Sequence, residues 1–138
     1  MACILLHAMI AMVANSPILV VDDSEDAQEF LSTTLIGAGY EVVQARNGRD
    51  ALAMVLDHRS PRLVIVDLVM PIMDGAELID VLHCYKRLAQ IPVLLVSSAD
   101  VPDTLRQTDA RYLRKPFDEE ELLSHVRALL HEPLTDGA

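Results

Sequence analysis

The chain alternates short, unbroken apolar runs with segments of helical periodicity, and this alternation limits its possible folds most strongly. The clearest run, residues 63–66 (Leu-Val-Ile-Val), contains no polar residue, and similar runs occupy 18–21 and 93–96. A strand that is apolar on both sides is usually buried on both faces of its sheet, which is typical of parallel sheets. Because strands and helical segments alternate five times, we predict an α/β fold with a parallel sheet covered by helices on both faces.

The other elements follow from local patterns. The helix expected over 24–39 begins at Ser24, a capping residue, and ends at Gly37 and Gly39. In the last helix, Asp118 stands at the N-cap with Glu121 three positions later, which resembles a capping box. Short strands are expected within 40–45 and 111–117, and helices with apolar faces at Ala51, Leu52, Val55 and Leu56, and at Leu78, Val81, Leu82 and Tyr85. The segment 101–110 is weakly patterned and predicts a shortened fourth helix.

Length and the N-terminal segment suggest one domain with an extension. The 138 residues suit a single domain, which we place at 17–131, followed by a short tail at 132–138. Residues 1–16 are apolar but shorter than the roughly 20 residues that span a bilayer. Three interpretations remain open: a true start at Met9 or Met12, an extra helix packing on the domain or a partner, or a weak export signal. The last is least favoured because a basic leader is absent.

Composition excludes some classes of protein. The net charge of −10 argues against direct nucleic-acid binding, which needs a basic surface. The two cysteines, Cys3 and Cys84, are far apart and predict neither a disulfide framework nor a zinc site. A reducing cytoplasm without membrane attachment is therefore the expected location.

Carboxylates gather where the predicted strands end. In a flavodoxin-like doubly wound sheet with strand order 2-1-3-4-5, the carboxyl ends of the strands meet at one edge, where ligands bind. The residues that follow these ends are Asp22, Asp23, Asp67, Ser97 and Lys115. Three neighbouring carboxylates repel one another, and oxygen ligands of this kind favour Mg²⁺. An aspartate can also attack phosphorus to form an acyl phosphate, whose negative charge a lysine would balance.

Four segments together, "ILVVDDSED", "LVIVDLVMPIMDG", "VLLVSS" and "YLRKPF", resemble the receiver domain of two-component response regulators, in particular single-domain, chemotaxis-regulator-like receivers. The resemblance covers roughly residues 17–131. It implies that Asp67 is the phosphoacceptor. It also implies that Asp22, Asp23, Asp67 and the backbone carbonyl of Val69 hold Mg²⁺.

The resemblance assigns further roles at the same edge. Ser97 would move to meet the phosphoryl group, Lys115 would pair with it, and Tyr112 would be the switch aromatic. The Lys115–Pro116 peptide bond is expected to be cis. The implied phosphoryl donor is a histidine kinase or a histidine phosphotransfer protein, and the implied targets are a downstream protein and a second copy in a homodimer. We expect a stand-alone receiver that acts as a phosphoacceptor and not as an enzyme.

Two other functions are compatible with parts of this pattern. A Mg²⁺-dependent phosphohydrolase of the haloacid dehalogenase type would also form an aspartyl phosphate. Such enzymes carry a second aspartate two positions after the first, where this chain has Val69. A pseudo-receiver that only binds partners would lack one of the acids or the lysine, and none is missing.

The short segment between Ser97 and Lys115 departs from the receiver pattern, because the usual Ala-Gly-Ala before the aromatic is absent.

Overall fold

The computed structural model describes residues 16–57, 60–70, 72–98, 100, 101, 103 and 110–131. The expected N-terminal extension, except Ser16, lies outside these residues. The C-terminal tail and the shortened fourth helix also fall outside them, apart from isolated positions of the latter. The elements are β1 (Ile18–Val21), α2 (Glu25–Gly37), β2 (Val42–Ala45), α3 (Gly48–Asp57), β3 (Leu63–Asp67), α4 (Gly75–His83), β4 (Val93–Ser97), β5 (Arg111–Arg114) and α6 (Glu119–Leu129).

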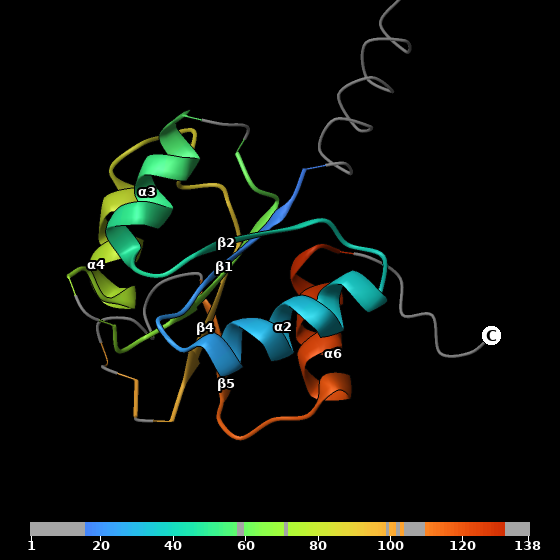
Figure 1. Cartoon of the computed structure of the whole chain (residues 1–138). Helices are drawn as coiled ribbons and strands as arrows, with labels where there is room; N and C mark the ends of the chain where they lie inside the picture. Colours follow the sequence, from blue (N-terminus) through green and yellow to red (C-terminus); the bar gives the residue numbers. More distant parts are fainter. Residues whose placement is uncertain are drawn as a thin grey trace, which may run out of the picture.

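The five strands form one parallel sheet in the order β2-β1-β3-β4-β5, which confirms the predicted topology (Figure 1). Its register decides which residues meet at the carboxyl edge. Val21 pairs with Val66, so the residues that directly follow them, Asp22 and Asp67, emerge side by side. Asp67 in turn pairs with Val96, one residue before Ser97.

Helices cover both faces of the sheet, α2 and α6 on one and α3 and α4 on the other (Figure 1). Alternate residues of each strand enter opposite cores. In β3, Val64 and Val66 pack on the α3 and α4 side, whereas Leu63 and Ile65 pack on the α2 and α6 side. This double burial is the physical reason why the central strands carry unbroken apolar runs.

Side-chain caps define three helix starts. Ser24 accepts a hydrogen bond from the backbone N–H of Ala27 at 3.3 Å. Asp74 and Asp118 accept at 2.9 and 2.8 Å from the backbone N–H groups three residues later. Each cap satisfies a backbone donor that the helix leaves open. The predicted caps at Ser24 and Asp118 are confirmed. At the far end of α2, Gly39 has φ of 98°, a value that glycine adopts without strain.

The third predicted helix is wrong at its C-terminal end. α4 stops at His83, and the chain then forms successive turns, with the N–H of Leu88 donating to the carbonyl of Tyr85 at 3.0 Å. These turns rotate Leu88 into the core and leave Tyr85 47% exposed, so Tyr85 is not on the buried face. That face consists of Leu78, Ile79 and Leu82.

Two other large apolar residues of the helices are also on the surface. The predicted face residue Leu56 is exposed, and so is the aromatic Phe30 of α2, because the buried stripes of these helices are narrower than the apolar pattern suggests. Within the described residues, no helix has the length and apolarity needed to span a bilayer.

Candidate functional site

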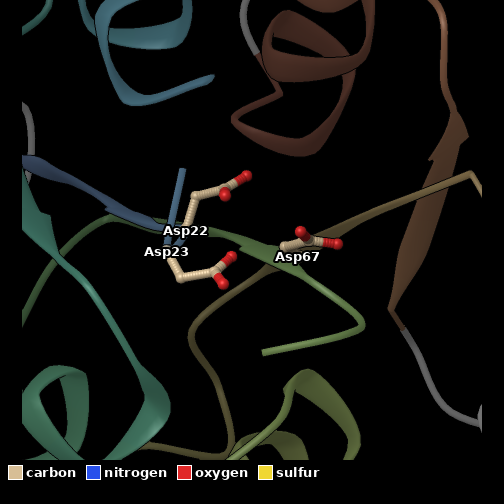
Figure 2. Close-up of side chains that lie close together, drawn as sticks. All are labelled: Asp22, Asp23 and Asp67. Carbon is tan, nitrogen blue, oxygen red and sulfur yellow. The ribbon is translucent and has the colours of Figure 1, made fainter. Parts of the chain in front are cut away.

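Three carboxylates lie together at the carboxyl edge of the sheet (Figure 2). Asp22 and Asp23 follow β1, and Asp67 is the last residue of β3. One oxygen from each side chain lies within 4.8 Å of the other two. Asp22 is buried, Asp67 is partly buried and Asp23 is exposed, so this acid cluster (Asp22, Asp23 and Asp67) opens to solvent on one side.

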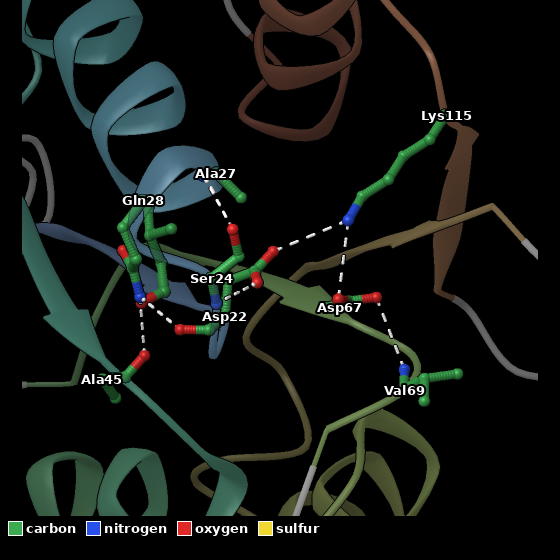
Figure 3. A network of polar contacts seen from close by, with 9 residues as sticks. Asp22, Ser24, Ala27, Gln28, Ala45, Asp67, Val69 and Lys115 are labelled. Carbon is green, nitrogen blue, oxygen red and sulfur yellow. Dashed lines mark hydrogen bonds and ion pairs between the residues drawn. The ribbon is translucent and has the colours of Figure 1, made fainter.

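Asp22 is fixed and electrostatically strained. Its Oδ1 accepts a hydrogen bond of 2.9 Å from the backbone N–H of Ser24, which also begins α2 (Figure 3). Burial raises the pKa of Asp22 above its ordinary value, and repulsion from Asp67 and Asp23 adds to this increase. The Ser24 hydrogen bond and the Lys115 ammonium act in the opposite direction. The site therefore favours a cation or a proton over three bare carboxylates.

Lys115 supplies one positive charge. Its Nζ lies 3.5 Å from Asp67 Oδ2 and 3.7 Å from Asp22 Oδ2 (Figure 3). The backbone N–H of Lys115 donates to the carbonyl of Ser97 at 2.9 Å, which ties the end of β5 to the end of β4. The Lys115–Pro116 peptide bond is cis.

The other predicted site residues lie on β3's C-terminal loop and on the neighbouring strands β4 and β5. The backbone N–H of Val69 donates to Asp67 Oδ1 at 3.4 Å, and the Val69 side chain is exposed. Ser97 is buried at the end of β4, the strand next to Asp67. Tyr112 pairs with Leu95, two residues before Ser97, and packs against the α3 and α4 core while staying partly exposed. The strand that carries Tyr112 is therefore adjacent to the strand that carries Ser97.

Gln28, which no sequence motif singled out, holds the framework of the site together. From α2, its buried side-chain amide donates to the carbonyls of Ala45, Asp22 and Val20 at 2.7, 3.0 and 3.3 Å (Figure 3). These bonds tie the helix to the ends of β1 and β2. Its spacing from the buried Leu31 and Leu35 of the same helix was the signal, since it places a polar residue on the buried face.

The role of Gly75, at the start of α4, is steric. A Cβ at this position would lie 2.6 Å from the carbonyl oxygen of Asp67 and 3.0 Å from the Cα of Leu68. The N–H of Gly75 donates to the carbonyl of Leu68 at 3.0 Å. Close packing of α4 against the end of β3 thus requires glycine, and this packing fixes the backbone that carries Asp67.

The donor set fits a divalent cation of the Mg²⁺ type. All three side chains of the acid cluster offer hard carboxylate oxygens, and the open side leaves room for water and a further oxygen ligand. Burial above all, and the neighbouring carboxylates of Asp67 and Asp23, raise the pKa of Asp22 even with Lys115 close by, so a bound cation would favour its charged form.

Comparisons with known proteins agree with this geometry. The profile of the response regulator receiver domain matches residues 18–127. The DNA-binding dual master transcriptional regulator RpaA of Synechocystis sp. is 38% identical over 117 residues, covering 82% of this chain and 48% of RpaA. Response regulator MprA of Mycolicibacterium vanbaalenii is 38% identical over 123 residues, covering 86% of this chain and 52% of MprA. The chain thus spans about half the length of these relatives.

Solved structures show the same fold. The signal receiver domain of a histidine kinase from Syntrophus aciditrophicus has a TM-score of 0.76 and 36% identity, over 84% of this chain and 90% of that one. Chemotaxis protein CheY4 of Vibrio cholerae has a TM-score of 0.76 and 31% identity, over 84% of this chain and 99% of that one. The profile covers most of the chain, and both solved structures match its fold over 84% of its length. The chain therefore belongs to the family of response regulator receiver domains.

Proposed function

We propose that the protein accepts a phosphoryl group on Asp67 from a histidine kinase or a histidine phosphotransfer protein. Receiver domains are signalling phosphoacceptor domains and not enzymes in the usual sense. The observation that carries the proposal is the convergence of Asp67 with Asp22, Asp23 and Lys115 at the edge of the sheet. Asp67 is the member of the acid cluster that Lys115 approaches most closely.

The transfer is a substitution at phosphorus. An Asp67 carboxylate oxygen attacks the phosphorus of the donor's phosphohistidine, and a bond between this oxygen and phosphorus forms. The nitrogen–phosphorus bond breaks, and the histidine nitrogen of the donor keeps the electron pair. Lys115, which directly follows β5, faces Asp67, so its ammonium stabilises the negative charge of the transferred group. The product is an acyl phosphate on Asp67.

The metal belongs to the same proposal. Asp22, Asp23, Asp67 and the backbone carbonyl of Val69 would hold Mg²⁺. Bound Mg²⁺ supplies positive charge that offsets both the cluster's repulsion and the charge of the phosphoryl group. Asp22 and Asp23 would hold the Mg²⁺ beside Asp67, because they follow β1, which pairs in register with β3.

Signalling would follow from a local change. In this proposal the added charge on Asp67 draws Ser97 and Lys115 inward, and the surface that includes Tyr112 shifts between two states. The output is contact with a downstream protein, and self-association into a homodimer is part of the same proposal. A cytoplasmic location is proposed as well. Its support is the cysteine usage, which includes the free, exposed Cys84.

The test is covalent labelling by a small phosphodonor, acetyl phosphate, in the presence of Mg²⁺. Intact-mass spectrometry should show one added phosphoryl group on the parent and none on an Asp67→Asn variant. Asp80→Asn is the matched control, because it removes the same charge from an exposed position on α4 and should label like the parent. Equal labelling of Asp67→Asn and the parent would rule out Asp67 as the acceptor.

A further inference from the structure

An apolar groove lies at the end of the sheet opposite to the acid cluster. Its volume is about 350 Å³. The apolar residues that line it come from the start of β1, from β2, from α3 and from the segment before β3: Pro17, Leu19, Val43, Met54, Val55 and Pro61. Among the described residues, Glu41 carries the only charge that borders it. A groove of this size and character is suited to large apolar side chains.

The walls of this groove are firmly held. The N–H of Arg62 donates to the carbonyl of Pro17 at 3.0 Å, and the N–H of Ile18 donates to the carbonyl of Glu41 at 2.8 Å. Leu19 and Val55 are buried at its base, whereas Val43 and Met54 are half-buried. The half-buried pair leaves apolar surface available to a further segment.

The chain itself supplies such a segment at the rim. Pro17 lines the groove, and only Ser16 separates it from the segment 1–15. Of these 15 residues, all but His7 and Asn15 are apolar, and none is Asp, Glu, Lys or Arg. A segment of this composition gains free energy by leaving water, and an apolar patch of its size invites association if it stays exposed.

We infer that residues 1–15 fold back and place their large apolar side chains in this groove of the same molecule. A return over a few residues suffices, because the segment joins the domain at the groove's edge. Attachment gives the segment an effective concentration in the millimolar range, which favours docking in cis over docking on a second copy at micromolar protein. Since the groove lies at the opposite end of the sheet, docking leaves the acid cluster accessible.

A tryptophan reporter tests this inference in the full chain. The sequence contains no tryptophan, so Leu6→Trp introduces a single fluorophore into the segment. Docking predicts blue-shifted emission that acrylamide quenches poorly. Adding Met54→Asp, which places a charge in the groove, should abolish both the shift and the protection. Leu56→Asp is the matched control, because Leu56 is exposed on the same helix outside the groove lining, and it should leave both unchanged.

Several results would overturn the inference. One is tryptophan emission in the Leu6→Trp protein at the wavelength expected for full solvent exposure. Another is protection of this tryptophan from acrylamide quenching that persists after Met54→Asp is added. Protection that disappears with dilution, as sedimentation shows a dimer dissociating, would assign the segment to a second copy. Protection that requires phosphatidylglycerol vesicles would assign it to a lipid surface.

Hydrogen exchange gives a readout that does not depend on altering the groove. The Met54→Asp variant could unfold the domain. A Leu5→Asp substitution avoids this, because it changes only the segment 1–15 and leaves the domain intact. Docking predicts that Leu5→Asp speeds amide exchange in β2 and in the second half of α3, while exchange in α6 stays as in the parent. Unchanged exchange in β2 and α3 would contradict the inference.

Discussion

Replacing Asp22 by asparagine should stabilise the metal-free protein at neutral pH. The substitution removes a buried negative charge that lies beside two others. Its geometric role survives, since an amide oxygen can still accept the hydrogen bond from the N–H of Ser24. The fold therefore loses repulsion and desolvation without losing the contact that begins α2.

The size of the effect follows from the distances in the site. At 4.8 Å, two unit charges repel by about 0.9 kcal/mol in water and about 3.5 kcal/mol at an effective dielectric constant of about 20. The ammonium of Lys115 lies 3.7 Å from Asp22 and attracts it by about 1.1 to 4.5 kcal/mol over the same range of dielectric constants. Two repulsions thus exceed one attraction by about 0.6 to 2.4 kcal/mol. Because Asp23 is exposed, we expect a gain near the lower end, about 1 kcal/mol, or roughly 4 °C in Tm.

The gain should depend on pH in a defined direction. The folded state raises the pKa of Asp22 above its ordinary value of 3.8, so the native protein binds this proton more tightly than the unfolded chain does. Stability of the parent therefore falls as the pH rises from about 3.8 through the higher pKa of the folded state. Below this range Asp22 is protonated in both states, and the advantage of Asp22→Asn should vanish.

Chemical denaturation in EDTA, at neutral pH and at acidic pH, measures this difference. Asp80→Asn again serves as the control for removing one exposed charge and should change stability little. Millimolar Mg²⁺ should stabilise the parent more than the Asp22→Asn variant and so reduce the difference between their free energies of unfolding. The electrostatic reasoning is refuted if Asp22→Asn is no more stable than the parent at neutral pH, or if its gain persists unchanged at acidic pH.

Four further substitutions test the framework of the domain. Gly75→Ala should destabilise the protein and slow labelling by acetyl phosphate, because the new Cβ would meet the Asp67 carbonyl at 2.6 Å. Gly37→Ala, which meets nothing within 4 Å near the end of α2, should stabilise it by about 0.5 kcal/mol in urea denaturation. Ile72 is a β-branched residue at φ 69°, so replacing it by glycine should raise the free energy of unfolding by about 1 kcal/mol. An unchanged Tm would count against strain at this position. Gln28→Met should lower the free energy of unfolding by about 2 kcal/mol, because three carbonyls lose a buried donor.

Much of the fold could be predicted from the sequence because its signals are local. The unbroken apolar run at 63–66 identifies a strand buried on both faces, and the caps at Ser24 and Asp118 mark where helices begin. The carboxyl-edge rule for parallel sheets then brings the acids and Lys115 into one place, although they are far apart along the chain. Only the family resemblance distinguished their individual roles, because spacing alone does not separate a metal ligand from an acceptor.

The tertiary structure decided what depends on contacts between distant segments. The apolar periodicity around Tyr85 continues past His83, yet the turns that bring Leu88 into the core end the helix there. The spacing of Gln28 places it on the buried face of α2, but only the tertiary structure brings the carbonyls of Val20, Asp22 and Ala45 to its amide. Gly75 becomes obligatory only where α4 packs against the backbone of Asp67. Sequence patterns report which side of an element is buried, whereas contact distances depend on how separate elements pack in space.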